Sequence, residues 1–190
     1  MQISAESVPL SCFESWVPNV GTNITVRALT VADGKDFRDF RAAALKIHPE
    51  AFGEDYDEFL AKPESEITSR LHEVDGTFVL GAFDDNKLVG TIGHARKPGK
   101  KNRHQAIIWG VYVDGSQRGR GIGRLLTEAA IAKSRALGDV EELQLTVITT
   151  NKNAMRLYES LGFKTYGVEP KALKVGTDYW EEALMHLPLR

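Results

Sequence analysis

Cysteine is nearly absent from this sequence, which has only Cys12 among its 190 residues. One cysteine cannot form an internal disulfide, and it cannot supply a CxxC motif for a metal or a redox reaction. Because disulfides are typical of secreted proteins, we expect a cytoplasmic location. Cys12 also lies outside the motifs described below, which leaves no obvious thiol nucleophile for covalent catalysis. We therefore predict neither a metal site nor a covalent enzyme intermediate.

Long apolar runs and an excess of one charge are also missing. No apolar run approaches the ~20 residues that a membrane helix needs. Residues 1–21 carry Glu6 and Glu14 but no basic residue, unlike the positively charged start of a secretory signal. The formal net charge is -2, with acids and bases mixed along the chain, so no broad positive field is available for a nucleic acid. We expect neither nucleic acid nor membrane as a partner.

The length of the chain suffices for one hydrophobic core. We interpret residues 1–21 as an N-terminal tail and residues 22–190 as a single domain. Alternating apolar positions predict strands, and apolar positions three or four apart predict helices. The expected strands are 24–29, 78–83, 88–93, 105–113, 143–148, 164–169 and 182–189, and the expected helices are about 32–47, 63–73, 121–138 and 151–162.

The order of these elements indicates a mixed α/β fold. Short turns join the strands between residues 78 and 113, which favours an antiparallel meander. The strand, helix and strand from 105 to 148 then imply a parallel crossover. We therefore expect a mostly antiparallel sheet that contains one parallel pair.

A glycine-rich turn lies between the strand that ends near Val113 and the following helix. Gly119, Gly121 and Gly123 remove three Cβ atoms, so that backbone N–H groups can point inward together. Such a turn at a helix N-terminus, with the positive end of the helix dipole behind it, is a site for a diphosphate. The positive side chains beside it are Arg118, Arg120 and Arg124.

Other nucleotide folds use comparable turns. The Walker sequence GxxxxGK[ST] is absent, which excludes a P-loop. A dinucleotide fingerprint needs a third glycine where this chain has Arg124, and an acid at the far end of the next strand, whereas Glu141 and Glu142 lie at its near end. A surface turn rich in glycine and arginine stays as the simplest alternative.

Two motifs together indicate a family. Arg118, Gly121 and Gly123 match the pattern Q/R-x-x-G-x-G/A. The pattern N-x-x-A-x-x-L-Y-x-x-x-G-F is matched downstream by Asn151, Ala154, Leu157, Tyr158, Gly162 and Phe163. In these motifs the sequence resembles the GCN5-related N-acetyltransferase (GNAT) family. The resemblance implies an acyl-CoA N-acyltransferase fold, with a twisted, mostly antiparallel sheet, a parallel central strand pair and flanking helices.

The resemblance also implies acetyl-CoA as co-substrate. The backbone around Val111 and Val113 would face its pantetheine arm, residues 118–124 would hold its pyrophosphate, and Asn151 would contact the arm. The full set of cofactor residues implied in this way is Val111, Tyr112, Val113, Arg118, Gly119, Arg120, Gly121, Ile122, Gly123, Arg124, Asn151 and Tyr158.

Amine attack on a thioester needs an N–H donor for the oxyanion and a proton source for the departing thiolate. A backbone N–H near Val111 is the expected donor. The tyrosine that matches Tyr158 protonates the CoA sulfur in the resembled family, so we predict Tyr158 as the general acid. The alternative is that Tyr158 is a core aromatic residue whose hydroxyl bonds to the backbone.

The general base is harder to predict, because the strand segment 106–110 carries no carboxylate. His104 and Glu169 are the candidates, acting directly or through water. Trp109 and Tyr112 are expected near the reaction centre. The helical cover that holds His48, Glu50, Phe52 and Tyr56 could form the acceptor pocket or could only roof the sheet.

The predicted function is direct transfer of an acetyl group to a primary amine of a small-molecule or peptide acceptor. Because residues 106–110 carry no carboxylate that could act as the base, the alternative is a non-catalytic acyl-CoA-binding sensor or partner-binding module. A third hypothesis, an enzyme that acts on protein or tRNA, requires a large docking surface, and the net charge gives the tRNA version no support. A homodimer is also compatible with the sequence.

Overall fold

The computed structural model describes residues 23–190 of the chain. The predicted tail with Cys12 lies outside these described residues, so the boundary between tail and domain stays a prediction. Among the helices of residues 23–190, none combines the length and the apolar character that crossing a membrane requires.

Within the described residues, seven strands form one sheet in the order β1-β2-β3-β4-β5-β7-β6. Neighbouring strands pair antiparallel, apart from β4 and β5, which run parallel. The expected mostly antiparallel sheet with a parallel central pair is therefore confirmed. The strands are β1 Ile24–Ala28, β2 Phe78–Asp84, β3 Lys87–Arg96, β4 Gln105–Val113, β5 Glu142–Ile148, β6 Lys164–Val175 and β7 Asp178–Pro188.

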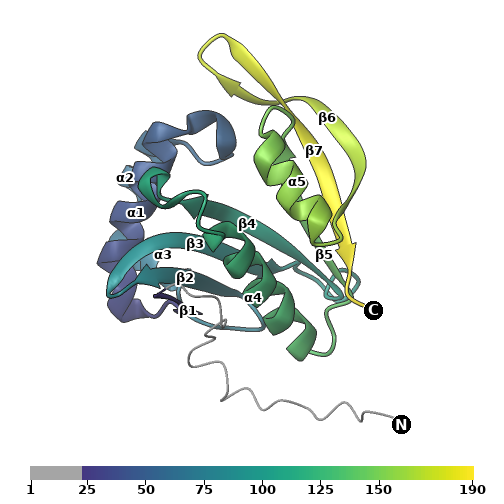
Figure 1. Ribbon diagram of the computed structural model, residues 1–190, viewed down its shortest axis with the longest axis horizontal. Coiled ribbons are helices and arrows are strands. Elements are labelled where there is room, and N and C mark those ends of the chain that lie inside the picture. The colour runs from purple at the N-terminus through teal and green to yellow at the C-terminus, as the bar shows by residue number, and fades with distance from the viewer. Residues whose placement is uncertain (1–22) are drawn as a thin grey trace.

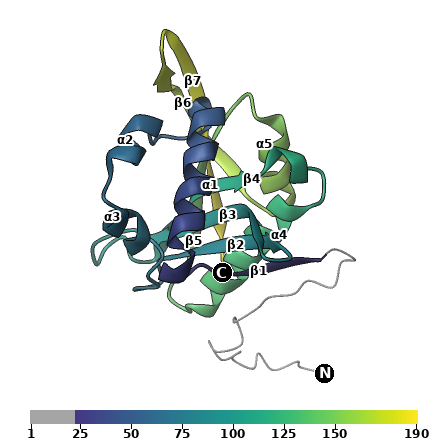
Figure 2. The ribbon, with the colours of Figure 1, turned by 90° about the vertical axis from the view of Figure 1, so that its left-hand side faces the viewer.

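Helices cover both faces of this sheet (Figures 1 and 2). Three of them, α1 (Gly34–Ile47), α2 (Tyr56–Ala61) and α3 (Glu64–Ser69), lie on one face. On the other face lie α4 (Ile122–Ala136) and α5 (Lys152–Ser160). Three short 3-10 turns flank these helices. η2 (Val31–Asp33) precedes α1, η3 (Pro49–Ala51) follows α1, and η4 (Gly115–Gln117) precedes α4.

The alternation of side chains along the strands builds a separate hydrophobic cluster on each face. On β5, Leu143, Leu145 and Val147 are buried in the cluster that packs under α4 and α5. Phe37 and Leu45 of α1 belong to the second cluster, on the opposite face. Burying one large apolar side chain contributes roughly 1.5–3 kcal/mol, so these two clusters hold the helices to the sheet.

The last two strands are longer than the sequence predicts. The pattern predicts strands only at about 164–169 and 182–189. Instead, β6 continues past Pro170 through an irregularity in the register between Glu169 and Leu173, where Lys171 has a φ of +55°. Gly176, with a φ of +59°, lies at the turn into β7. The resulting β6–β7 hairpin extends beyond the other strands (Figure 1).

Candidate active site

The central parallel pair of strands separates after three residue pairs. Gln105, Ala106 and Ile107 of β4 pair with Glu142, Leu143 and Gln144 of β5. Beyond them β4 bends at Gly110, where φ is +61° and the register with β3 shifts. The remaining part of β4 therefore has no ladder partner on its β5 side. A free strand edge offers N–H and C=O groups to an extended ligand that carries amides of its own.

The glycine turn follows this free edge. Gly119 and Gly121 have φ values of +81° and +76°, which glycine adopts without steric cost. A Cβ atom built on either glycine would meet no atom within 4 Å, so both face open space. Gly121 is the N-cap of α4 and makes no side-chain cap hydrogen bond. The first N–H groups of this 15-residue helix are thus free of intrahelical partners and suit a diphosphate.

The three arginine side chains around the turn point in different directions. Arg118 lies against His48, with 2.9 Å between its Nη2 and His48 Nε2. Arg124 donates to Ser160 Oγ at 2.5 Å and lines the cavity described next. Arg120 instead pairs with Asp84 of β2 at 2.7 Å and does not line that cavity. The prediction that Arg120 holds the cofactor therefore finds no support in its side-chain position.

One cavity of about 820 Å³ joins the free edge of β4, the glycine turn and α5. Its volume lies within the range of small-molecule and cofactor sites. Most of the predicted cofactor residues line it. They are Val111, Tyr112, Val113, Arg118, Gly119, Gly121, Ile122, Gly123, Arg124, Asn151 and Tyr158.

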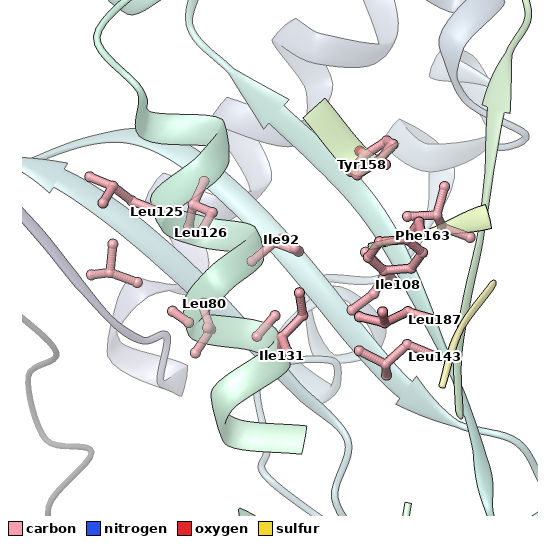
Figure 3. Close-up of a cluster of buried hydrophobic side chains, with 14 of the residues drawn as sticks. Leu80, Ile92, Ile108, Leu125, Leu126, Ile131, Leu143, Tyr158, Phe163 and Leu187 are labelled. Atoms are coloured by element: carbon pink, nitrogen blue, oxygen red, sulfur yellow. The ribbon is translucent and has the colours of Figure 1, made fainter. Parts of the chain in front are cut away.

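Asn151 and Tyr158 are positioned by α5. Asn151 is the N-cap of the helix, and its side-chain oxygen accepts a hydrogen bond from the Ala154 N–H at 3.1 Å. Tyr158 is only 6% exposed and packs edge-to-face on Phe163, at the end of the cluster that includes Ile108 (Figure 3). Burial raises the pKa of the Tyr158 phenol far above its usual value. This hydroxyl therefore stays protonated at neutral pH.

Residues of the loop after α1 close the cavity on the other side. His48, Glu50, Ala51 and Phe52 line it, whereas Tyr56 does not. The ring of Tyr112 lies 6.1 Å from the His48 ring and 6.4 Å from the Phe52 ring, measured between centroids. Trp109 does not line the cavity, because its ring packs over Gly93, where a Cβ atom would lie 2.1 Å from the indole. The helical cover thus contributes directly to the site.

Neither candidate base lies in this cavity. His104 is exposed and immediately precedes β4, and its carbonyl accepts the N–H of Glu141. Six steps along the strand, or roughly 20 Å at about 3.3 Å per residue, separate Gln105 from Val111. Glu169 is exposed on β6 and pairs with Glu182 of β7. The positions of both residues argue against the predicted role.

Sequence reasoning missed several lining residues. Gln117, Ile148, Thr150, Asn153 and Trp180 also face the cavity. Gln117 and Asn153 lie inside or beside the motifs, so motif spacing could have found them. Trp180 gave no local signal, because the hairpin that carries it was not predicted at full length. Its indole Nε1 is buried and has no hydrogen-bond partner in the described part of the chain.

The sequence model of the acetyltransferase (GNAT) family matches residues 40–163, which is more than half of the chain. The mycothiol acetyltransferase of Thermomonospora curvata is 32% identical over 151 residues, which cover 74% of this chain and 48% of that protein. The mycothiol acetyltransferase of Mycobacterium leprae is 33% identical over 183 residues, covering 89% and 54%. The chain spans about half the length of these two relatives.

Solved structures share the fold. An acetyltransferase of the GNAT family from Streptococcus pneumoniae superimposes with a TM-score of 0.78 at 24% identity, covering 87% of this chain and 98% of that one. A putative acetyltransferase from Salmonella typhimurium, solved with its cofactor acetyl-CoA, gives a TM-score of 0.75 at 22% identity, covering 89% and 95%. The family match and the shared fold agree with the two sequence motifs. This chain belongs to the acetyltransferase (GNAT) family.

Proposed function

We propose that this protein transfers the acetyl group of acetyl-CoA directly to a primary amine of a small molecule or a peptide. One observation carries the proposal. A single cavity joins an open glycine turn at a helix N-terminus, an unpaired strand edge and a buried tyrosine hydroxyl. These three features match the diphosphate, the amide-bearing arm and the thioester end of acetyl-CoA.

The fit to the cofactor rests on space and on hydrogen-bond donors. The diphosphate fits the empty volume at Gly119 and Gly121, where it accepts hydrogen bonds from the N–H groups at the start of α4. The pantetheine amides pair with the backbone of Val111 and Val113. Acetyl-CoA, when bound, supplies an activated acyl group on a thiolate leaving group.

The protein supplies donors at the two atoms that gain negative charge. A backbone N–H beside Val111 donates to the carbonyl oxygen as the tetrahedral oxyanion forms. The Tyr158 hydroxyl gives its proton to the departing sulfur, and the raised pKa keeps this hydroxyl protonated until that moment. Residues 23–190 contain no cysteine, and in this proposal the amine attacks the thioester itself.

The test is release of CoA thiol from acetyl-CoA in the presence of single acceptors. The panel contains small primary amines, a peptide with an N-terminal alanine, and a mycothiol-type aminothiol whose thiol is blocked. We expect turnover that depends on one of these acceptors, with the N-acetyl product identified by mass spectrometry.

Binding of acetyl-CoA with no turnover across the whole panel would instead support the alternative, a non-catalytic acyl-CoA-binding module. The absence of a carboxylate from residues 106–110 of β4 is the observation that keeps this alternative in view. Failure of CoA and acetyl-CoA to bind at all would contradict both functions.

A further inference from the structure

His48 has two polar neighbours that fix the state of its ring. Its Nε2 lies 2.9 Å from Arg118 Nη2, and its Nδ1 lies 3.4 Å from Glu50 Oε1. A guanidinium can only donate, so Nε2 must accept and carries no proton. The neutral ring then holds its proton on Nδ1, where the Glu50 carboxylate accepts it. The lone pair of His48 Nε2 therefore points toward Arg118.

The same arrangement places this nitrogen beside the cofactor edge. The guanidinium of Arg118 contacts His48 Nε2 and also the Val113 carbonyl oxygen, the latter from Nε at 3.3 Å. It also lies over the Tyr112 ring, 5.9 Å from the centroid. The Arg118 guanidinium therefore bridges the His48 imidazole and the free edge of β4. His48 and Glu50, in the segment after α1, line the same cavity as Tyr158 of α5.

We propose that His48, oriented by Glu50, is the base that deprotonates the acceptor amine, and that Arg118 covers this base until the cofactor binds. The inference rests on the proposed function. A carboxylate that accepts from one ring nitrogen, while the other nitrogen faces the substrate, is the arrangement by which an imidazole serves as a general base. No carboxylate of β4 is required, because the base comes from the loop after α1.

The proton balance of the step is complete. His48 Nε2, directly or through one water, takes a proton from the acceptor ammonium, and the neutral nitrogen attacks the thioester carbonyl carbon. The C–N bond forms, the C–S bond breaks, and Tyr158 gives its proton to the thiolate. The amide nitrogen loses a second proton, which restores the Tyr158 hydroxyl through solvent. His48 returns its proton to solvent, so the products are the N-acetyl amine, CoA thiol and one proton.

Cofactor binding uncovers the base through Arg118. A diphosphate is an anion that accepts two parallel hydrogen bonds from a guanidinium, whereas a neutral imidazole accepts only one. The guanidinium of Arg118 therefore moves to the diphosphate held at Gly119 and Gly121. His48 Nε2 therefore becomes accessible only when acetyl-CoA is in place, so the acceptor amine meets the base after the cofactor has bound.

The groups that face His48 are few in the described structure. They are the Glu50 carboxylate, the Arg118 guanidinium and the Tyr112 ring. Glu50 and Arg118 have opposite charges and contact opposite edges of the ring.

The kinetic test compares His48→Gln and Glu50→Gln with the wild type, using the panel amine that the wild type acetylates fastest. We expect kcat/KM at pH 7 to fall about 100-fold in His48→Gln and about tenfold in Glu50→Gln. The deficit should shrink as the pH rises, because the acceptor then arrives deprotonated. The affinity for CoA should change less than about twofold. His72→Gln, an exposed histidine outside the cavity, is the matched control.

The second test needs no acceptor and reads His48 by ¹⁵N NMR. Adding CoA to the wild type should move the Nε2 resonance, because the hydrogen bond from Arg118 is lost. In Arg118→Met, which has no donor, the resonance should already lie at the CoA-bound position before CoA is added. This result would stand even if no panel amine is acetylated, so it separates the inference from the proposed function.

Three results would overturn the inference. A deficit in His48→Gln that is equal at every pH would mean a purely structural role. A larger loss in His104→Gln than in His48→Gln would place the base at the start of β4. If CoA binds to the wild type but leaves the Nε2 resonance unchanged, Arg118 does not cover His48 in the free protein.

Discussion

The cavity has two halves that are built in different ways. The proposed cofactor half consists of residues 111–124 and the helix α5, which lie within residues 111–160 of the sequence. The proposed acceptor half consists of residues 48–52 and Trp180, which lie more than 100 residues apart. The cofactor half offers mainly backbone groups, and the acceptor half offers side chains.

This difference follows from what each half has to recognise. A diphosphate and two amides are satisfied by N–H and C=O groups, so the chain must provide a conformation, which glycines and a helix N-terminus supply. An acceptor is distinguished by its shape and charge, so the chain must provide particular side chains. The first requirement leaves a motif in the sequence, whereas the second is met by whichever residues the fold brings together.

The sharpest test of the comparison is Tyr158→Phe, because Tyr158 belongs to the cofactor half but acts in the chemical step. We expect kcat to fall about 100- to 1000-fold, since the thiolate loses its proton donor. The dissociation constant for acetyl-CoA should stay within about twofold when measured by calorimetry. Tyr166→Phe, at a ring that is 57% exposed on β6, is the control and should behave as the wild type. Weaker binding without loss of kcat would contradict the assigned role.

The next largest effect is expected at the glycine turn. Gly121→Val forces a β-branched residue to a φ of +76° and fills open space in the cofactor half. We expect the affinity for CoA to fall about 100-fold, or ~3 kcal/mol. Gly99→Val introduces similar strain at a φ of +86° in the turn between β3 and β4, away from the cavity. If both variants lost CoA affinity equally, strain rather than the site would be responsible.

A loss of activity at low pH can come from unfolding as well as from the site. His94 allows the contribution of unfolding to be measured separately. His94 is fully buried against Phe78, its Nδ1 donates to the Gly76 carbonyl at 2.7 Å, and burial lowers its pKa to about 4 from 6.5. The unfolded chain therefore takes up this proton first as the pH falls. Stability present above pH ~6.5 is lost toward pH ~4, amounting to about 2 kcal/mol at pH 5.

Urea unfolding at pH 7.5 and at pH 5 measures this loss. In His94→Gln the difference between the two pH values should shrink by about the same 2 kcal/mol, whatever the cost of the substitution itself. The exposed His72→Gln should keep the wild-type difference. An unchanged difference in His94→Gln would assign the acid sensitivity to other groups.

The smallest effect is expected in the acceptor half. The Trp180 indole N–H is buried without a partner in the described structure, and the residue lines the cavity. Trp180→Phe removes this donor, and we expect the acceptor KM to rise about tenfold while the affinity for CoA is unchanged. Tyr179→Phe, at the exposed neighbouring position, serves as the control. A loss of CoA affinity in Trp180→Phe would show that the two halves are not separate.

The same division explains how much the sequence predicts. The sheet and the parallel crossover follow from periodicity, because they depend on local conformation. The residues proposed to hold the cofactor follow from two motifs and the family resemblance, and nearly all of them line the cavity. Arg120 was predicted with its neighbours, yet its side chain pairs with Asp84, on a strand that the motif does not include. The direction of a long side chain is a tertiary property.

The acceptor half could not be predicted in the same way. His104 is a candidate base because it lies at the start of β4 and carries a titratable side chain, but that end of the strand lies outside the cavity. The contact between His48 and Arg118 joins residues 70 positions apart. The hairpin that carries Trp180 is longer than the predicted strands, because an irregularity near Pro170 and a turn at Gly176 are accommodated between paired strands.

The early separation of β4 from β5 has a mechanical consequence. Three residue pairs hold β1–β4 to β5–β7, so the sheet has a seam through its middle. In the proposed complex the pantetheine arm lies along this seam and pairs with strand backbone. The cofactor then serves as a missing strand, and its release leaves three residue pairs and the shared hydrophobic cluster under α4 and α5 to join the two parts of the sheet.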